Sequence, residues 1–331
     1  MIEIRSLTKR YDSLTAVDSV DLDVADGQFA VLLGPSGSGK TTLLRMVNRM
    51  IEPTSGTVLL DGRDTAELKV ETLRRSMGYV IQNTGLFPNM TIRKNVGTVP
   101  RLLGWDKKRI DARVDELLDL VGLDPDTYGP KRPDQLSGGE AQRVGVARAL
   151  AADPPVLLMD EPFGAVDPLT RERLQQEMKR LQAKVKKTIL FVTHDIDEAV
   201  LLADRIALLK SGVLQQYSTP EQMWREPANE FVRGFFGENL GLRIMARHCL
   251  SSVPLDPAPP AGTETLPRVP ASATLKEALA ELVGSGASAV LVVDGDRVLG
   301  SFGFEALVRA LSDGSGDSIA CGPGATAGGT A

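Results

Sequence analysis

The sequence is poor in the features that mark membrane-spanning, zinc-binding and nucleic-acid-coating proteins. No apolar run approaches the roughly 18 residues that a membrane-spanning helix needs. The two cysteines, Cys249 and Cys321, have neither the CxxC spacing of a zinc site nor the number needed for a framework of disulfide bonds. The formal charge of −5 excludes a generally basic protein that coats nucleic acid.

Two further absences concern targeting and the core. The first six residues lack a basic segment followed by an apolar stretch, so we expect no secretory signal. Aromatic residues make up only 5% of the chain, so we expect a core of Leu, Val, Ile and Ala. With 331 residues, at roughly 150 per domain, the chain is long enough for about two domains.

Short apolar runs that alternate with helical patterns dominate residues 1–237. Most of these runs are continuously apolar, which suits parallel strands covered on both faces. We expect such strands at Phe29–Leu33, Gly78–Ile81, Val156–Met159, Thr188–Val192 and Arg205–Leu209. The helices between them predict an α/β fold with a mainly parallel central sheet. Residues 2–8 and 15–24 alternate more and predict an antiparallel β subdomain.

Helical periodicity predicts a helical subdomain inserted at about residues 86–150. Its clearest helix covers residues 107–122, where apolar residues recur at helical spacing and Gly122 marks the end. A region rich in Pro, Thr and Ala predicts a linker over residues 238–273.

Beyond this linker we expect a second, smaller domain over residues 274–312. Its pattern is helix, strand, strand, helix, with a turn at Asp294-Gly295-Asp296 between the strands. Residues 313–331 are rich in Gly, Ala and Ser without periodicity, and we expect them to be disordered.

A phosphate-binding loop is the strongest motif. The run Gly34-Pro35-Ser36-Gly37-Ser38-Gly39-Lys40-Thr41-Thr42 matches G-x-x-x-x-G-K-[ST] between a predicted strand and a predicted helix. The glycines allow backbone N–H groups to point into one concavity at a helix N-terminus, which favours phosphate. We expect ATP here, with Lys40 bridging the β- and γ-phosphates and the Thr41 hydroxyl binding Mg²⁺.

Two adjacent acids, Asp160 and Glu161, end the apolar strand that begins at Val156. The carboxyl end of a buried parallel strand is where nucleotides bind in such sheets. We therefore expect Asp160 to hold Mg²⁺ through water, and Glu161 to act as the general base that deprotonates the attacking water.

A third motif, Leu136-Ser137-Gly138-Gly139-Glu140, precedes a predicted helix. By itself it is a turn and a helix cap. In the order phosphate loop, Gln82, Leu136–Glu140, Val156–Glu161, Gly164–Asp167 and His194, it resembles the motif set of the ATP-binding-cassette (ABC) ATPases. The resemblance covers residues 1–237. Glu140 stands where the family most often has Gln.

The resemblance implies roles for the remaining positions. Ser137, Gly138 and Gly139 would bind the γ-phosphate of ATP held by another subunit, and Asp167, also a helix cap before Pro168, would cross the subunit interface. Three residues would act at the nucleotide itself. Tyr11 would stack on adenine, Gln82 would touch Mg²⁺ and the attacking water, and His194 would contact the γ-phosphate and align the water with Glu161.

The same resemblance implies the partners. One cassette holds half of each site, so a second copy would bind head to tail with two-fold symmetry. Transmembrane permease subunits would receive the motion, a solute-binding protein would be an indirect partner, and no nucleic acid is expected. The chain would lie peripherally on the cytoplasmic face of the cell membrane.

Longer matching segments indicate which branch of this family the chain resembles. Residues 78–82, 85–92, 99–105, 116–125 and 162–168 resemble ATPase subunits of importers for glycine betaine, choline or carnitine. Residues 274–312 resemble one cystathionine-β-synthase-type (CBS) module, either a sensor of ionic strength or nucleotides, or a dimerisation element without ligand. Two alternatives stay open: an importer of amino acids or metal, and a non-transport ABC ATPase. The acidic balance and the lack of a long insertion disfavour the latter.

Overall fold

The computed structural model describes residues 1–81, 85–164, 166–257 and 266–312. Two of the predicted features, Gln82 and the tail 313–331, lie outside these ranges. Contacts divide the chain into Met1–Thr219 and Pro220–Ala331. Helices α10 (Pro220–Arg225) and α11 (Glu230–Phe236) therefore fall in the second unit, and a boundary near residue 237 stays a prediction.

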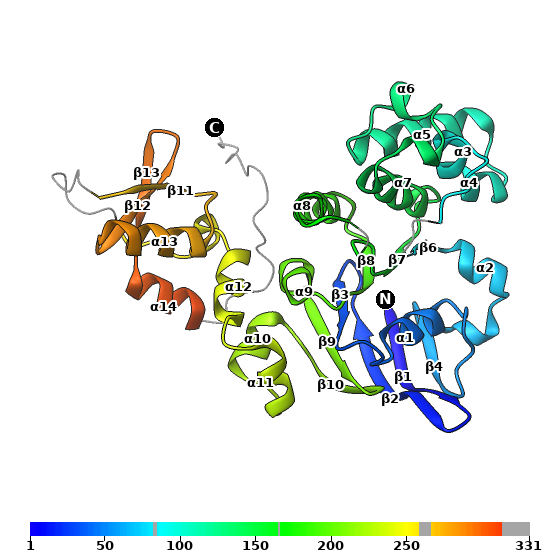
Figure 1. Cartoon of the computed structure of the whole chain (residues 1–331), viewed down its shortest axis with the longest axis horizontal. Coiled ribbons are helices and arrows are strands. Elements are labelled where there is room, and N and C mark those ends of the chain that lie inside the picture. The colour runs from blue at the N-terminus through cyan, green and yellow to red at the C-terminus, as the bar shows by residue number, and fades with distance from the viewer. Residues whose placement is uncertain (82–84, 165, 258–265, 313–331) are drawn as a thin grey trace. The chain divides into compact units, whose positions relative to one another are not determined.

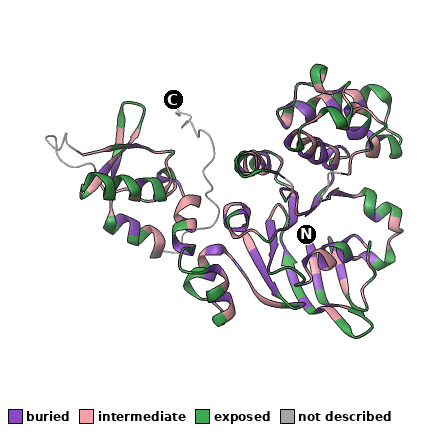
Figure 2. Ribbon diagram, in the orientation of Figure 1, coloured by how far each residue is buried: buried purple, intermediate pink, exposed green. Residues whose placement is uncertain are grey.

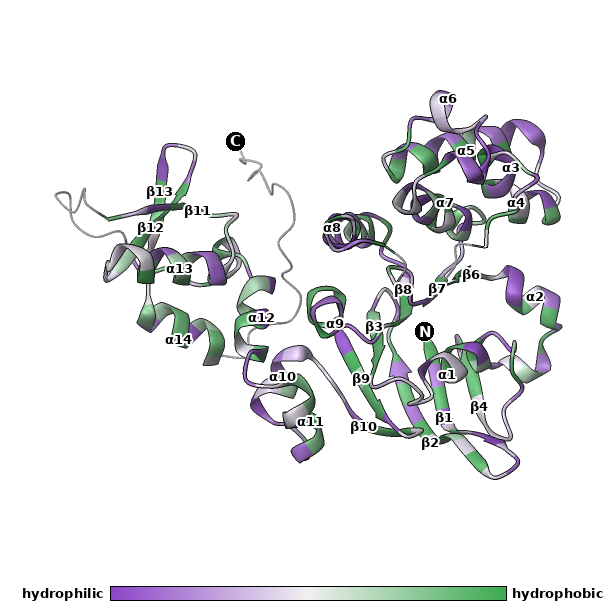
Figure 3. Ribbon diagram, viewed as in Figure 1, coloured by the Kyte–Doolittle hydropathy of each residue, from purple (hydrophilic) through white to green (hydrophobic). Residues whose placement is uncertain are grey.

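A six-stranded sheet with the order β10-β9-β3-β8-β7-β6 forms the centre of the first unit. Its strands are β3 (Phe29–Leu33), β6 (Met77–Val80), β7 (Val156–Asp160), β8 (Thr188–Val192), β9 (Arg205–Lys210) and β10 (Val213–Ser218). All neighbours are parallel except β10, which pairs antiparallel with β9. Every residue of β3, β7 and β8 is buried, which suits their largely apolar sequences (Figures 2 and 3). The two polar exceptions are Asp160, at the end of β7, and Thr188, at the start of β8.

An antiparallel sheet with the order β2-β1-β4-β5 packs beside it. Its strands are β1 (Ile2–Tyr11), β2 (Leu14–Val24), β4 (Ser55–Leu60) and β5 (Arg63–Asp64). Their inward side chains share one apolar core with β3 and helix α1 (Lys40–Val47). The expected α/β fold with a mainly parallel sheet and an antiparallel β subdomain is confirmed.

Helices α3 to α7 gather together at the upper right of Figure 1, in the range of the expected helical subdomain. They are α3 (Ile92–Val96), α4 (Thr98–Leu102), α5 (Lys107–Leu120), α6 (Pro125–Tyr128) and α7 (Gly138–Leu150). The other helices of this unit are α2 (Val70–Arg75), α8 (Pro168–Val185) and α9 (Ile196–Leu202). One-turn 3₁₀ helices occur at Thr65–Glu67 and Pro133–Gln135.

The second unit has its own sheet, β11-β12-β13, and its own apolar core. Besides α10 and α11 it contains α12 (Leu240–Arg247), a 3₁₀ turn (Leu250–Ser252), β11 (Arg268–Pro270), α13 (Leu275–Ser285), β12 (Ala289–Asp294), β13 (Arg297–Gly303) and α14 (Phe304–Ser312). The expected helix, strand, strand, helix order is present, preceded by β11. Among the described residues, no helix is both long and apolar enough to cross a membrane.

Candidate functional site

The phosphate loop connects β3 to α1 with a backbone that requires glycine at two positions. Gly34 has φ 149° and Gly39 has φ 97°. A Cβ atom would lie 2.2 Å from the carbonyl oxygen of Leu209 at the first position, and 2.3 Å from that of Ala16 at the second. Both positions therefore exclude side chains by backbone conformation and by close approach. The loop is clamped between β9 and β2.

Lys40 lies in this loop with its ammonium group turned inward. Its Nζ donates hydrogen bonds to the carbonyl oxygens of Gly34 at 2.7 Å and Pro35 at 2.9 Å. The residue is only 6% exposed. Burial lowers the pKa of Lys40, while the charges of Glu161 and Asp160 act in the opposite direction. A positive charge is thus held at the concavity that phosphates would occupy.

A cavity of about 540 Å³ lies over the loop. Residues 36–42 line it together with Tyr11, from the end of β1, and Glu161, from the end of β7. Tyr11 is 44% exposed, and the Lys9 ammonium lies 4.9 Å from the centre of its ring. The fold thereby brings the predicted adenine-stacking residue to the phosphate loop. The buried Ser38 Oγ atom has no hydrogen-bond partner among the described residues.

Asp160, at the end of β7, links the central sheet to helix α1, which follows the phosphate loop. Its Oδ1 accepts a 2.9 Å hydrogen bond from Thr41 Oγ1. Its Oδ2 lies 3.3 Å from Arg45 Nη2 and accepts a 3.5 Å hydrogen bond from the Tyr79 hydroxyl. Burial is the main cause of the raised pKa of Tyr79.

The neighbouring oxygens of Thr41 and Asp160 fit Mg²⁺, which is usually held by one or two carboxylates together with substrate phosphates. No group of three or more His, Cys, Asp or Glu side chains in the described ranges could hold a metal by itself. The other ligands would therefore have to come from nucleotide and water.

Glu161 and His194 come together beyond the ends of β7 and β8. The backbone N–H of Glu161 donates to the Val192 carbonyl at 3.0 Å, and the residue has φ 45°, in the left-handed region. Its Oε2 lies 3.3 Å from His194 Nδ1. The expected general base, which lines the phosphate-loop cavity, and the histidine expected to align the attacking water are thus neighbours. Gln82, expected at the same place, is outside the described residues.

A buried acid behind His194, Glu198 of α9, escaped the sequence analysis. It is 4% exposed and accepts hydrogen bonds from Thr193 Oγ1 at 2.6 Å and Gln175 Nε2 at 3.1 Å. Burial raises the pKa of Glu198. Thr193 Oγ1 in turn accepts from the Asp195 N–H at 3.0 Å. These bonds fix the backbone on both sides of His194.

The Ser-Gly-Gly motif stands at the N-terminus of α7 and does not line the phosphate-loop cavity. Ser137 and Glu140 form a capping box: Ser137 Oγ accepts from the Glu140 N–H at 3.3 Å, and Glu140 Oε2 accepts from the Ser137 N–H at 2.7 Å. The Tyr128 hydroxyl donates to Glu140 Oε1 at 2.7 Å. Glutamate at this departure from the family pattern therefore has a defined structural role.

Asp167 caps the next long helix, α8. Its Oδ1 accepts from the Thr170 N–H at 3.1 Å, with Pro168 in the first turn. The Thr170 side chain, and after it this backbone bond, lower the pKa of Asp167. The helix-cap interpretation of Asp167 is confirmed, whereas its place at a subunit interface stays a prediction.

Replacing Glu140 by Gln should change how stability depends on pH. The hydrogen bonds from Ser137 and Tyr128 lower the pKa of Glu140 from 4.5 to about 2. A carboxyl whose pKa falls on folding adds stability above its unfolded pKa and loses it as the pH falls toward its folded pKa. We therefore expect the stability difference between wild type and Glu140→Gln to shrink from about pH 4.5 downward. Thermal unfolding of both proteins, measured at a series of pH values, gives this stability difference. A difference that does not change with pH would contradict the assignment of the Glu140 carboxylate as the hydrogen-bond acceptor.

Comparison with known proteins agrees with this geometry. A family model described as ABC transporter matches residues 17–164. The osmoprotectant import ATP-binding protein OsmV of Salmonella typhimurium is 47% identical over 303 residues, which cover 89% of this chain and 77% of that protein. The glycine betaine/carnitine/choline transport ATP-binding protein OpuCA of Bacillus subtilis is 46% identical over 300 residues, which cover 90% and 77%.

Among solved structures, the dimeric bacterial ABC transporter cassette MJ0796 matches with a TM-score of 0.60 and 35% identity. The match covers 66% of this chain and 98% of that cassette. A post-hydrolysis dimer of the same cassette, bound to ADP and Pi, matches with a TM-score of 0.59, 35% identity and the same coverage. The fold and the site thus define the protein as a nucleotide-binding P-loop ATPase of the cassette class. The chain belongs to the family of ABC transporter ATP-binding proteins.

Proposed function

We propose that this chain is the ATP-hydrolysing subunit of an importer for quaternary-ammonium osmoprotectants such as glycine betaine, choline or carnitine. The observation that supports it best is the extent of the similarity. The alignments with OsmV and OpuCA cover about nine-tenths of this chain, and thus reach beyond the cassette into the second unit. In this role the chain would lie peripherally on the cytoplasmic face of the cell membrane, bound to permease subunits and served indirectly by a solute-binding protein.

The chemistry that we propose uses the residues around the phosphate loop. The loop N–H groups and Lys40 bind the phosphates, and Tyr11 stacks on adenine. Thr41 and Asp160, with Gln82, would hold Mg²⁺, which when bound neutralises charge on the phosphate oxygens.

The hydrolytic step centres on Glu161. Its carboxylate accepts a proton from water as the water oxygen attacks the γ-phosphorus, and the bond from that phosphorus to the ADP oxygen breaks. His194, 3.3 Å from Glu161, aligns the base and contacts the γ-phosphate.

The position of the Ser-Gly-Gly motif supports a two-chain site. Ser137, Gly138 and Gly139 lie outside the cavity over their own phosphate loop, so they would complete a site only on another subunit. The matched cassette MJ0796 is itself dimeric. In the proposed head-to-tail dimer, ATP joins the two copies, and loss of the γ-phosphate removes the contacts that keep them closed.

Uptake by proteoliposomes that contain this chain, its permease and its solute-binding protein tests the proposed substrate. We expect ATP-dependent accumulation of labelled glycine betaine or choline, and none with Glu161→Gln. A sulfate/thiosulfate import ATP-binding protein, CysA of Bradyrhizobium diazoefficiens, is also 44% identical over 247 residues, so labelled sulfate is the informative contrast. Accumulation of sulfate without betaine or choline would overturn the assignment.

We further propose that the second unit regulates transport as a single CBS-type module that pairs with that of a second copy. Its helix α14 exposes Phe304 and Val308, 53% and 61% exposed. The double substitution Phe304→Ser and Val308→Ser should leave basal ATP turnover unchanged and abolish the response of uptake to ionic strength. Uptake measured at low and high salt tests this proposal. An unaltered response to salt would contradict the regulatory role and leave α14 with a role in dimerisation only.

A further inference from the structure

Lys9, on β1, lies against the ring of Tyr11, the residue that we propose to stack on adenine. Its Nζ atom is 4.9 Å from the centre of the ring. Tyr11 lines the phosphate-loop cavity, whereas Lys9 is not among the residues that line it. The ammonium group therefore contacts the ring without belonging to the wall of the cavity.

The position of Tyr11 at the end of a hairpin leaves its ring with little other support. Tyr11 pairs with Leu14 of β2 across the two-residue turn Asp12-Ser13. Tyr11 is 44% exposed and Leu14 is 64% exposed. A ring so exposed can occupy several rotamers, and stacking on a base would cost the entropy of selecting one of them. A contact that selects the rotamer beforehand therefore favours nucleotide binding.

The ammonium group of Lys9 is itself held by the segment that follows helix α1. Its Nζ donates a 2.7 Å hydrogen bond to the carbonyl oxygen of Glu52. The Glu52 carboxylate accepts a 3.1 Å hydrogen bond from Nη2 of Arg49. Nη1 of Arg49 in turn donates to the carbonyl oxygens of Thr65 at 3.1 Å and Leu68 at 3.0 Å. The cation is thus fixed by the fold, independently of nucleotide.

A cation close to the face of an aromatic ring is attracted by the negative charge of the π system. Because the Lys9 ammonium is anchored at Glu52, this attraction restrains the ring. We infer that Lys9 is a positioning residue, which holds the Tyr11 ring in the orientation that stacks on adenine. The inference rests on the stacking role of Tyr11 in the proposed function.

Substitutions of Lys9 test the restraint through ATP turnover. Lys9→Met keeps an unbranched side chain and removes the charge. We expect the KM for ATP to rise about two- to fivefold with kcat unchanged, because only binding is weakened. Lys9→Arg keeps a cation and should stay within about twofold of the wild-type KM. An unchanged KM in Lys9→Met would overturn the inference.

Inorganic tripolyphosphate separates an effect on the base from an effect on the phosphates. It carries the phosphate chain of ATP without adenine, and calorimetric titration in the presence of Mg²⁺ measures its affinity. Lys9→Met should bind tripolyphosphate as wild type does, because there is no base for Tyr11 to stack on. An equal loss of affinity for tripolyphosphate and for ATP would overturn the inference, since the charge would then act on the phosphates directly.

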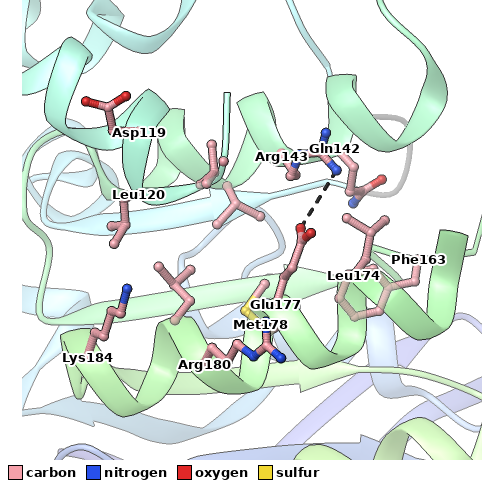
Figure 4. Close-up of a pocket in the computed structure, with 14 residues that line it drawn as sticks. Asp119, Leu120, Gln142, Arg143, Phe163, Leu174, Glu177, Met178, Arg180 and Lys184 are labelled. Atoms are coloured by element: carbon pink, nitrogen blue, oxygen red, sulfur yellow. Dashed lines mark ion pairs between the residues drawn. The ribbon is translucent and has the colours of Figure 1, made fainter. Parts of the chain in front are cut away.

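Two matched variants control for the loss of one positive charge. Arg10→Met removes a cation from the next residue of β1. Lys184→Met removes one from a separate cavity of about 220 Å³ between α5, α7 and α8 (Figure 4). This second cavity shares no lining residue with the phosphate-loop cavity. Both variants should keep the wild-type KM, and a rise as large as that of Lys9→Met in either would overturn the inference.

A double-mutant cycle with Tyr11→Leu shows whether Lys9 acts through the ring. Tyr11→Leu should weaken ATP binding, and adding Lys9→Met should weaken it no further, because the ring to be held is gone. Additive losses would overturn the inference and leave the stacking role intact. Wild-type affinity in Tyr11→Leu would overturn the stacking role in the proposed function, and with it the role of Lys9.

Discussion

Replacing Glu161 by Gln should lower ATP turnover by about a hundredfold or more, because a positioned general base contributes about that factor. The amide keeps the size of the side chain but cannot accept the proton of the attacking water. The φ of 45° at this position is kept as well, since glutamine tolerates the same backbone as glutamate. ATP binding and ATP-driven dimerisation should survive.

Two measurements on purified protein test this expectation. Phosphate release gives the turnover, and gel filtration with ATP and Mg²⁺ gives the fraction of dimer. Glu172→Gln, an exposed acid near the start of α8, is the matched control and should behave as wild type. Normal turnover by Glu161→Gln would remove Glu161 from the role of base.

The second large effect concerns nucleotide binding. Lys40→Ala removes the ammonium group that bonds to the Gly34 and Pro35 carbonyls at the phosphate loop. Hydrogen bonds to a charged group contribute roughly 1.5–3 kcal/mol each, so the loss of two phosphate contacts should weaken ATP binding at least about a hundredfold.

Titration with a fluorescent ATP analogue measures this loss of affinity. Lys107→Ala, on the exposed start of α5, removes a lysine remote from the loop and serves as the control. A melting curve of each variant separates lost binding from lost folding. Unchanged affinity in a folded Lys40→Ala protein would overturn the assignment of the phosphate loop.

Much of the central sheet could be predicted because its strands are buried on both faces. The sequence of β3 is apolar throughout, that of β8 is apolar after Thr188, and the predicted limits of both strands agree with the structure to the residue. Strand β10 escaped prediction because it forms the edge of the sheet and carries Gln215 and Gln216 within Val213–Ser218. It pairs antiparallel with β9 across the two-residue turn Ser211-Gly212, both residues of which have positive φ, so the turn is the local signal that predicts this strand.

The site divides in the same way. Residues within one motif, such as Gly39, Lys40 and Thr41, follow from spacing, because a strand, a tight turn and a helix place them. The role of Glu198 could not be predicted from the sequence, because it depends on hydrogen bonds from Gln175 and Thr193. These residues belong to other elements, which only the fold brings next to Glu198. Asp197 and Glu198 both lie in the first turn of the helix Ile196–Leu202, where acids are common, so position in the sequence does not distinguish Glu198.

Helix α8 connects the Asp167 cap with the segment around His194, two features that stand apart in the sequence. It starts at the Asp167 cap, one turn later places Arg171 Nη1 3.6 Å from Asp195 Oδ2, and one turn further presents Gln175 to Glu198. In the proposed dimer its first residues face the other copy, while its next two turns steady the His194 segment of its own. A movement at the interface between the two copies would therefore be transmitted along α8 to His194 of the same copy. The two ATP molecules should then be consumed cooperatively, with a Hill coefficient above one.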